Sequence, residues 1–462
     1  MSGKYVAYHE YKDSGVGFLN KLPVSWGIKK VNYLFSFGRG LNITKANLED
    51  SGVPVVNYGE VHSKFGFEIN PDIHNLKRVS EDYLKTTPAA LLQNGDFVFA
   101  DTSEDLDGAG NFTQFVGNGL LFAGYHTVVL RPNDGNVSRY LAYAFESTEC
   151  RNQIRLAVKG VKVFSITQSI LKDVMLPMPP PEEQITIAAF LDYETARIDQ
   201  LIAKQQRLIE LLKEQRQAVI SHAVTKGLNP NAPIKDSGVE WLGQVPEHWS
   251  VLRLKHVITA LESGCSVNAA DTPAEANEVG VLKTSCVYTR SFRANENKTV
   301  LPEDLHRVKC PVRKGSIIIS RMNTPDLVGA SALVDIDTRD IYLPDRLWQS
   351  IFNRNVELEP EYLAYFMTIE GFRVQISLAA EGASSSMQNI AKEDYLAINC
   401  LLPSLVEQIE IVGYLKAKLQ YFDRLDASAC RAIYLLQERR TALISAAVTG
   451  KIDLRGWSQP NA

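Results

Sequence analysis

The sequence predicts an α+β protein built as a pseudo-two-fold internal repeat, with two mixed α/β domains separated by two long helices. Three observations predict this architecture. Short motifs near the N-terminus return about 223 residues downstream, each copy ends in a matching stretch without internal proline, and the segments between these matches look unrelated. At 462 residues the chain is long enough for several domains.

The overall composition is that of a globular protein, with 45% hydrophobic and 22% charged residues. The net charge of −4 gives no general preference for nucleic acid, so a DNA reader with this balance must gather its basic residues on one face. Six cysteines without a CxxC pair predict neither a zinc site nor disulfides and suit a reducing compartment. Because the N-terminus is polar and no apolar run reaches about 18 residues, we expect a cytoplasmic protein without a membrane partner.

The first repeated element is a lead-in near the start of each copy. Lys12–Val16 returns as Lys235–Val239, and both copies continue with a leucine, a proline and a tryptophan. An old duplication without functional meaning is the alternative, and it is disfavoured because the matches are confined to the ends of each copy. The later pairs are Leu19 and Leu242, Pro23 and Pro246, and Trp26 and Trp249, at an offset of 223.

The second repeated element closes each copy and reads as a helix. Glu182 and Glu183 follow a run of prolines in the first copy, and Ser404 with Glu407 forms a capping box in the second. The proline-free stretches that follow, about 44 residues each, predict helices of roughly 65 Å. The matched parts are Pro179, Glu183 and Gln184 with Pro403, Glu407 and Gln408, and Leu211–Thr225 with Leu435–Thr449, at an offset of 224.

Both predicted helices carry apolar residues at heptad spacing, which favours packing against each other as a coiled coil. Parallel and antiparallel packing both remain open on these grounds, as does a homodimer formed through the helices. The helices are also basic, which fits a solvated face as well as a docking surface for another subunit or for phosphate. The predicted seam consists of Ile198, Leu201, Leu208, Leu212 and Val219 in the first helix and Phe422, Leu425, Leu436 and Leu443 in the second.

The dissimilar middle of each copy contains short β-like runs flanked by helical stretches. Such a mixture predicts an α/β domain with a twisted sheet and long loops. The strand candidates are Gly52–Val56, Asp96–Ala100, Thr127–Leu130 and Ser316–Ser320, and the helical stretches are Ser138–Arg155 and Pro360–Leu378.

Loops around these strands carry side chains that suit DNA. Arginine and lysine match guanine edges, asparagine and glutamine match adenine edges, and small hydroxyls bind phosphate. Each such residue taken alone is better explained as an ordinary solvated surface group, so only the clustering in loops around strands carries the hypothesis. The candidates are Arg39, Lys45, Tyr58, His62, Lys64, Lys159 and Lys162 in the first middle, and Lys283, Thr284, Arg290, Arg293, Arg321, Asn323, Arg346, Ser384, Ser385 and Gln388 in the second.

No catalytic constellation is found in the sequence. It lacks a GxxxxGK[ST] phosphate loop, a complete GxGxxG, histidines paired at metal-binding spacing and the Asn-Pro-Pro-aromatic run used to methylate exocyclic amines. We therefore predict no catalytic and no metal-ligating residues. The alternatives are a methyltransferase or nuclease with its own recognition domains, and a coiled-coil scaffold that ignores DNA.

At this point the pattern resembles the specificity (S) subunit of Type I restriction–modification systems. The residues that carry the resemblance span nearly the whole chain. They are Asp13–Val16 with Pro23 and Trp26, Asp236–Val239 with Pro246 and Trp249, the Pro-Glu-Gln segments Pro179–Gln184 and Pro403–Gln408, and the helix ends Ala223–Thr225 and Ala447–Lys451. One small departure is that the first copy ends Thr-Lys-Gly and the second Thr-Gly-Lys.

The resemblance implies that each middle is a target-recognition domain for one half of a split, asymmetric site in double-stranded DNA, and that the helices form an antiparallel coiled coil that sets the spacing. Two modification subunits with S-adenosylmethionine would dock on the chain and methylate adenine, and two restriction subunits with ATP and magnesium can join them. The chain itself would bind no cofactor and catalyse nothing. The expected parts are a lead-in (1–26), first recognition domain (27–178), first helix (179–228), repeated lead-in (229–250), second recognition domain (251–402), second helix (403–452) and tail (453–462).

Overall fold

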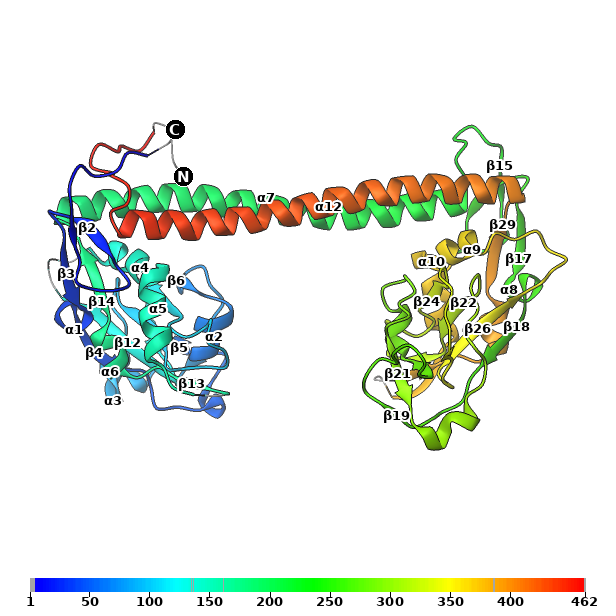
Figure 1. The fold of residues 1–462 in the computed structure, drawn as a ribbon, viewed down its shortest axis with the longest axis horizontal. Helices are drawn as coiled ribbons and strands as arrows, with labels where there is room; N and C mark the ends of the chain where they lie inside the picture. Colours follow the sequence, from blue (N-terminus) through cyan, green and yellow to red (C-terminus); the bar gives the residue numbers. More distant parts are fainter. Residues whose placement is uncertain (1–4, 134, 136, 161, 385–386, 461–462) are drawn as a thin grey trace. The chain divides into compact units, whose positions relative to one another are not determined.

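A computed structural model describes residues 5–133, 135, 137–160, 162–384 and 387–460. The chain divides into two compact units, and the second is inserted into the first. Unit 1 comprises Met1–Gln206 with Cys430–Ala462, and unit 2 comprises Arg207–Ala429. Each unit therefore takes one part of each long helix (Figure 1).

Unit 1 begins with a hairpin formed by the lead-in, followed by the first middle domain, which we define as residues 27–178. Its elements are β1 (Tyr11–Asp13), β2 (Lys21–Pro23), β3 (Gly27–Lys30), α1 (Val31–Leu34), β4 (Phe35–Arg39), η1 (Lys45–Asn47), β5 (Val53–Val56), α2 (Tyr58–Ser63), β6 (Phe67–Ile69), β7 (Arg78–Val79), α3 (Tyr83–Thr86), η2 (Pro88–Ala90), β8 (Phe97–Ala100), β9 (Thr102–Ser103), β10 (Phe112–Phe115), β11 (Phe122–Ala123), β12 (Thr127–Pro132), α4 (Ser138–Glu146), α5 (Thr148–Ala157), β13 (Phe164–Ser165), α6 (Gln168–Asp173) and β14 (Met175–Met178).

Unit 2 repeats the hairpin and continues into the second middle domain, which we define as residues 251–402. Its elements are β15 (Ile234–Asp236), β16 (Gln244–Pro246), β17 (Ser250–Arg253), α8 (Leu254–Val257), β18 (Ile258–Ser263), β19 (Ala269–Ala270), β20 (Gly280–Leu282), η3 (Thr284–Val287), β21 (Asn297–Val300), η4 (Pro302–Arg307), β22 (Ile317–Ser320), β23 (Met322–Asn323), β24 (Ser331–Leu333), β25 (Ile341–Tyr342), β26 (Leu347–Phe352), α9 (Pro360–Phe366), α10 (Glu370–Ala379), β27 (Glu381–Ser384), β28 (Met387–Asn389), α11 (Lys392–Ala397) and β29 (Asn399–Leu402).

The two middle domains share a strand order although their sequences look unrelated. Four strands of the main sheet correspond, β4-β12-β8-β10 in the first domain and β18-β26-β22-β24 in the second, and the first sheet has a fifth strand, β6, parallel to β10. In both, a short parallel pair lies in a separate small sheet (β11 with β5, β20 with β25). A further pair, β3 with β14 and β17 with β29, joins the start of each domain to its end. The internal repeat therefore includes the middle domains, which resemble each other in strand topology and not in sequence.

Each predicted helical stretch is split into two helices. In the first domain α4 and α5 meet at Ser147, whose side chain accepts a hydrogen bond from the backbone N–H of Cys150 at 3.3 Å and starts a new helix. In the second, α9 ends before Thr368, whose hydroxyl donates to the carbonyl of Tyr365 at 2.7 Å. The pattern of apolar residues does not reveal these local side-chain hydrogen bonds, so it predicted one helix where the structure has two.

Two long helices, α7 (Pro181–Lys226) and α12 (Leu405–Val448), are antiparallel. In unit 1 the first half of α7 contacts the last part of α12, where Asp199 lies 3.2 Å from Arg440. In unit 2 the last part of α7 contacts the first half of α12 through an ion pair between Arg216 and Asp423. The antiparallel packing that the resemblance implied is therefore confirmed, whereas the heptad pattern alone had left the helix direction open.

The predicted seam needs correction at two positions. Leu201 and Leu208 are 45% and 39% exposed, so they do not lie in the helix interface. The sequence places an isoleucine directly after each of them, at 202 and 209, and the less exposed member is the isoleucine in both cases. Adjacent apolar residues leave a heptad frame ambiguous by one residue. Of the other seam residues, Ile198, Leu212 and Leu443 are buried, and Val219, Phe422, Leu425 and Leu436 are half-buried.

Each long helix is followed by a glycine with left-handed backbone, Gly227 (φ 77°) and Gly450 (φ 68°). A Cβ at Gly227 would lie 3.1 Å from the ring of Trp249, and one at Gly450 would collide with Pro23 and lie 3.4 Å from Trp26. These glycines are separated by 223 residues, whereas the preceding helices match at 224. At the Thr-Lys-Gly and Thr-Gly-Lys endings the offset between the two copies therefore returns from 224 to 223 residues.

We predict that Ile198→Ala and Leu201→Ala differ sharply although the two residues lie on the same helix. Ile198 is 3% exposed, so truncation should lower the free energy of unfolding by about 2–5 kcal/mol. Leu201→Ala should stay within about 0.5 kcal/mol of the unaltered chain. Urea unfolding of the full chain measures both, and equal losses would restore Leu201 to the seam.

Candidate nucleic-acid interface

The start of each long helix holds the lead-in of its own unit. In unit 1 the hydroxyl of Tyr8 and the indole N–H of Trp26 both donate to Glu183 Oε2 at 2.9 Å. In unit 2 Trp249 donates to Glu407 Oε1 at 3.3 Å, and a ring nitrogen of His248 lies 2.8 Å from the same oxygen. The repeated glutamates therefore have the same task, which is to anchor a buried tryptophan.

The neighbouring glutamines fix the middle domains to the helices. Gln184 and Gln408 are almost completely buried, and each donates from Nε2 to the carbonyl of the proline five residues before it at 2.9 Å. Their Oε1 atoms accept backbone N–H bonds just before α4 and α9, from Val137 at 3.4 Å and Glu359 at 2.7 Å. The frame thus orients both middle domains through equivalent bonds.

An aromatic cluster on the first middle domain contains two of the sequence candidates, Tyr58 and His62 of α2. Tyr58 packs edge-on against Tyr125 and His126, with ring centroids 5.8 and 5.5 Å apart. Tyr58 and His62 also line a cavity of about 570 Å³ with the acidic loop around residues 102–108. The sequence interpretation had assigned no DNA role to Tyr125 or His126, because neither belongs to a recognisable motif.

His62 is held by internal hydrogen bonds. Its Nε2 lies 2.6 Å from the carbonyl of Thr102, and its Nδ1 lies 3.0 Å from the amide nitrogen of Asn111. Asn111 in turn accepts from Arg151 at 2.8 Å, and Arg151 also pairs with Glu146. Because both ring nitrogens are engaged, His62 lines the cavity with its hydrogen-bonding groups already occupied.

The remaining candidates of the first domain are separate exposed cations. Among the residues that the structure describes, none of their side chains has a hydrogen bond or ion pair. Arg39 closes β4 opposite Val128, Lys45 lies in η1, Lys64 follows α2, and Lys159 and Lys162 lie in the segment before β13. Such residues suit phosphate contacts.

Several candidates of the second domain support one another internally. Asn323 donates to the hydroxyl of Tyr288 at 2.7 Å, and that hydroxyl lies 2.8 Å from Thr284 Oγ1. Arg293 donates to the carbonyl of Ser285 at 2.8 Å. Lys283 lies 3.5 Å from Asp271. These side chains hold loops in place.

Other candidates in this domain have side-chain polar atoms without a hydrogen-bond partner among the described residues. Arg321 and Arg346 are joined by a backbone hydrogen bond of 3.1 Å, and no described residue pairs with either guanidinium. Gln388 stands opposite Asn323 in the pairing of β23 with β28, and its Oε1 is buried without a hydrogen-bond partner in the described structure. Ser384 lies in β27 with its side chain outside the described part, and Ser385 lies outside the described residues.

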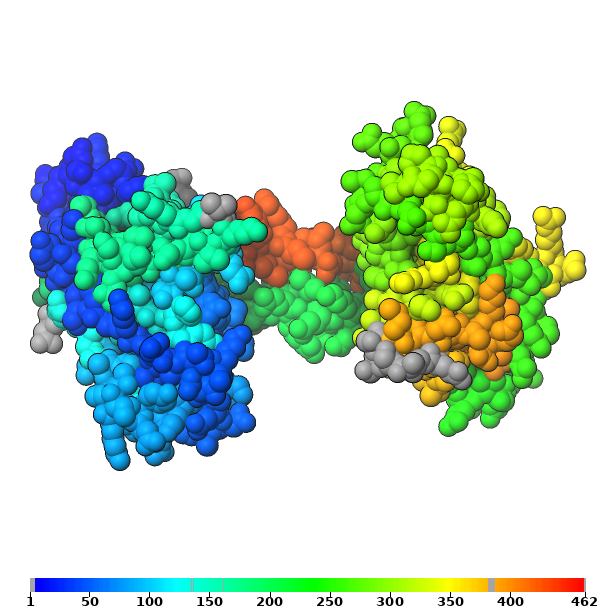
Figure 2. Space-filling model, turned by 90° about the horizontal axis from the view of Figure 1, so that it is seen from below, coloured from blue at the N-terminus to red at the C-terminus, as the bar shows by residue number. Residues whose placement is uncertain are grey.

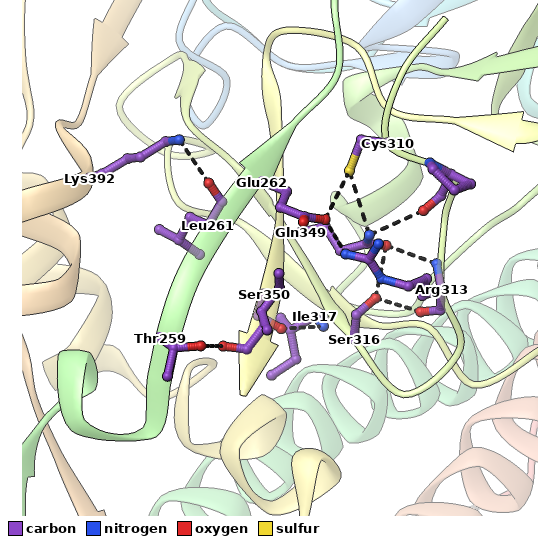
Figure 3. A network of polar contacts seen from close by, with 12 residues as sticks. Thr259, Leu261, Glu262, Cys310, Arg313, Ser316, Ile317, Gln349, Ser350 and Lys392 are labelled. Atoms are coloured by element: carbon purple, nitrogen blue, oxygen red, sulfur yellow. Dashed lines mark hydrogen bonds and ion pairs between the residues drawn. The ribbon is translucent and has the colours of Figure 1, made fainter. Parts of the chain in front are cut away.

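A polar network inside the sheet supports the second domain (Figure 3). Arg313 pairs with Glu262 of β18, while Gln349 of β26 accepts from the backbone of Arg313 at 2.8 Å and donates to the carbonyl of Pro311 at 3.1 Å. Burial, together with the adjacent Glu262 carboxylate, raises the pKa of Cys310 to about 11. The thiol therefore stays protonated and belongs to the scaffold.

Residues 23–211 match the family model described as the Type I restriction modification DNA specificity domain. The Type I restriction enzyme EcoKI specificity subunit of Escherichia coli (strain K12) is 23% identical over 456 residues, which cover 96% of this chain and 92% of that protein. The MjaVIII specificity subunit of Methanocaldococcus jannaschii is 27% identical over 321 residues, covering 68% of this chain and 70% of that protein.

Two solved structures share the fold. A chain from work on complex assembly and conformational transition of the type I R-M system aligns with a TM-score of 0.68 at 18% identity, covering 93% of this chain and 99% of that chain. The HsdS subunit from Thermoanaerobacter tengcongensis aligns with a TM-score of 0.51 at 18% identity, covering 93% and 98%. These structures share the repeated frame with two similarly folded domains. Over nearly its whole length the chain is similar to Type I restriction–modification specificity subunits.

Within the described residues, no helix is long and apolar enough to cross a membrane, and no three His, Cys, Asp or Glu side chains gather as metal ligands.

We predict that Glu407 stabilises unit 2 in a pH-dependent way. Burial opposes ionisation, but hydrogen bonds from His248, Ser404 and Trp249 outweigh it and lower the pKa of Glu407 below its ordinary 4.5. A lowered folded-state pKa gives stability that is present above the ordinary value and lost as pH falls through the folded value. The stability difference between the unaltered chain and Glu407→Gln should therefore shrink between about pH 6 and about pH 3 in urea unfolding. A pH-independent difference would contradict this assignment.

Proposed function

We propose that each middle domain reads one half of an asymmetric bipartite site in double-stranded DNA. The observation that carries this proposal is that the two domains have the same strand order on a repeated frame but unlike side chains at equivalent places. Because the two domains have similar topology, corresponding faces of each can meet DNA. Because the side chains on these faces differ, we expect the two half-sites to differ as well. The recognition domains are proposed as residues 27–178 and 251–402.

Some of the available side chains suit base edges, and others suit the phosphate backbone. Arg321 and Arg346 suit guanine O6 and N7, and Gln388 suits an adenine edge, since its amide can both accept and donate. Arg39, Lys45 and Lys64 in the first domain suit phosphates and would set position without reading sequence. The aromatic cluster around Tyr58 supplies flat apolar surface in the same domain.

The long helices are proposed as the spacer between the two readers. α7 and α12 each run through both units without a break. Half-sites read from one side of B-DNA are spaced by about one helical turn, roughly 34 Å. The helices are also the proposed docking surface for modification subunits.

The chain is proposed to be non-catalytic and to act in the cytoplasm. Two modification subunits would bring S-adenosylmethionine and methylate adenine, and two restriction subunits would bring ATP and magnesium. A methyltransferase with its own recognition domains is the alternative, and methyl transfer by the purified chain alone would favour it. A coiled-coil scaffold is the other alternative, and it would show no salt-dependent DNA binding.

Mapping methylated bases in DNA from cells that express the complex tests the proposed function. We expect methylation at a two-part site with different half-sites. Replacing residues 27–178 by the equivalent domain of a relative should change one half-site and leave the other. A change in both halves, or a palindromic site, would refute the modular assignment.

We predict that Arg321→Gln and Arg346→Gln each reduce discrimination at one base pair by about 1–3 kcal/mol, because a bidentate guanine contact is lost. Competition binding of the complex to the mapped site and to single-base variants measures this change. Arg354→Gln removes the same charge from an exposed turn of the same domain and should leave discrimination intact. Equal effects of all three substitutions would mean that only net charge is sensed.

A further inference from the structure

Two arginines of unit 2, Arg290 and Arg373, lie near each other without a carboxylate partner. Among the described residues neither takes part in an ion pair. Arg290 Nη1 donates to Gln217 Oε1 of α7 at 3.1 Å, and Arg373 Nη2 donates to the carbonyl of Asp326 at 3.1 Å. Two neighbouring cations that are satisfied only by neutral acceptors leave positive charge uncompensated.

Partial desolvation makes this arrangement costly, above all for Arg373, because Arg290 remains exposed at the surface. Desolvation lowers the pKa of both arginines, and for Arg373 the nearby Arg290 cation lowers it further while Tyr395 and Asp326 act in the opposite direction. Arg307 of the same domain shows the usual situation, in which the pKa is raised by a hydrogen bond to Asp304. Arg373 Nη1 is also buried with no hydrogen-bond partner in the described structure, which is an uncommon state for so strong a donor.

The two guanidinium groups border the same cavities. One cavity of about 140 Å³ is lined by both arginines together with the hydroxyl-bearing residues Tyr288, Ser331 and Thr368. A wider opening of about 350 Å³ adjoins both arginines on the side of α7 and α10. Asp326 and Glu370 also line these spaces, and neither forms an ion pair with the arginines. The hollow is therefore polar, small and positively charged on one side.

The backbone holds Arg290 in this place. Its φ of 60° lies in the left-handed region, which is uncommon for a residue with a side chain. Such outliers often accompany functional positions. The hydrogen bond to Gln217 ties Arg290 to a long helix, so the site joins a loop of the second middle domain to the frame.

We propose that Arg290 and Arg373 form a binding site for a tetrahedral phosphate group at the junction of the second middle domain and helix α7. Two guanidinium forks with a free N–H match the oxygens of a phosphate, and neighbouring hydroxyls add donors. The phosphate can come from the DNA backbone or from free phosphate. The first source rests on the proposed DNA-reading function, and the second does not. The sequence had named Arg290 as a DNA candidate but not Arg373.

The first arm of the test uses inorganic phosphate and the purified full chain. Thermal unfolding is followed in phosphate and in chloride at matched pH and ionic strength. We expect phosphate to raise the melting temperature of the unaltered chain and of Arg354→Gln, since ligands that bind the folded state stabilise it. The shift should vanish in Arg373→Gln and Arg290→Gln and should partly return in Arg290→Lys, which keeps the charge.

The second arm uses the complex with its modification subunits and the mapped DNA site. Loss of one backbone contact should lower affinity equally for all sequences and reduce the slope of log affinity against log salt by about 1. We expect this in Arg290→Gln and Arg373→Gln but not in Arg354→Gln. A change confined to the DNA arm identifies the backbone as the source, and a change confined to the first arm identifies free phosphate.

An unchanged salt slope together with no effect of phosphate on the unaltered chain would overturn the proposal and leave the DNA-reading function standing. Absence of specific DNA binding by the unaltered complex, with a phosphate shift that depends on both arginines, would refute the function and support the site. Circular dichroism of each variant checks folding, and a variant that unfolds is replaced by its lysine counterpart for both arms.

Discussion

The arrangement of the chain depends on a tryptophan placed between the start of one long helix and the end of the other. Trp26 donates to Glu183 at the start of α7 and lies against Gly450, which follows α12. Trp249 donates to Glu407 at the start of α12 and lies against Gly227, which follows α7. Because each tryptophan contacts both helices, the lead-in closes each unit and requires antiparallel helices. A side chain at Gly227 would crowd the ring of Trp249, and one at Gly450 would collide with Pro23 beside Trp26.

Most of the frame could be predicted from the sequence, because its signals are local and occur twice. The lead-ins repeat at an offset of 223, and the helix starts and heptads repeat at 224, so the second copy has one extra residue between Trp249 and Pro403. The offset returns to 223 at Gly227 and Gly450. The seam was less certain where two apolar residues adjoin, as at Leu201 and Leu208. Breaks at Ser147 and Thr368 were missed, since they arise from single side-chain hydrogen bonds.

The middle domains show why the site was harder to predict. Figure 2 shows that the face of each domain is assembled from chain segments of different colours, so residues far apart in sequence adjoin there. Their sheets are also supported by different polar interactions. The buried carboxylate of Asp96 accepts from Arg131 at 2.7 Å in the first domain, whereas Gln349 and the pair of Arg313 with Glu262 serve in the second. The two middle domains therefore cannot be recognised as similar from their sequences, although the order of their strands is alike.

The partners of each arginine separate scaffold from candidate contacts, which residue type alone cannot do. Arg131, Arg293 and Arg313 each pair with a carboxylate, so their charge is already compensated inside the domain. Arg321 and Arg346 have no such partner among the described residues, and neither do Arg290 and Arg373. A cation that the fold itself does not compensate is stabilised when an anion arrives. In the second middle domain the structure thereby draws attention to two pairs of arginines. Arg321 and Arg346 are joined by a backbone hydrogen bond and suit base edges, whereas Arg290 and Arg373 line one small cavity near helix α7 and suit a single phosphate.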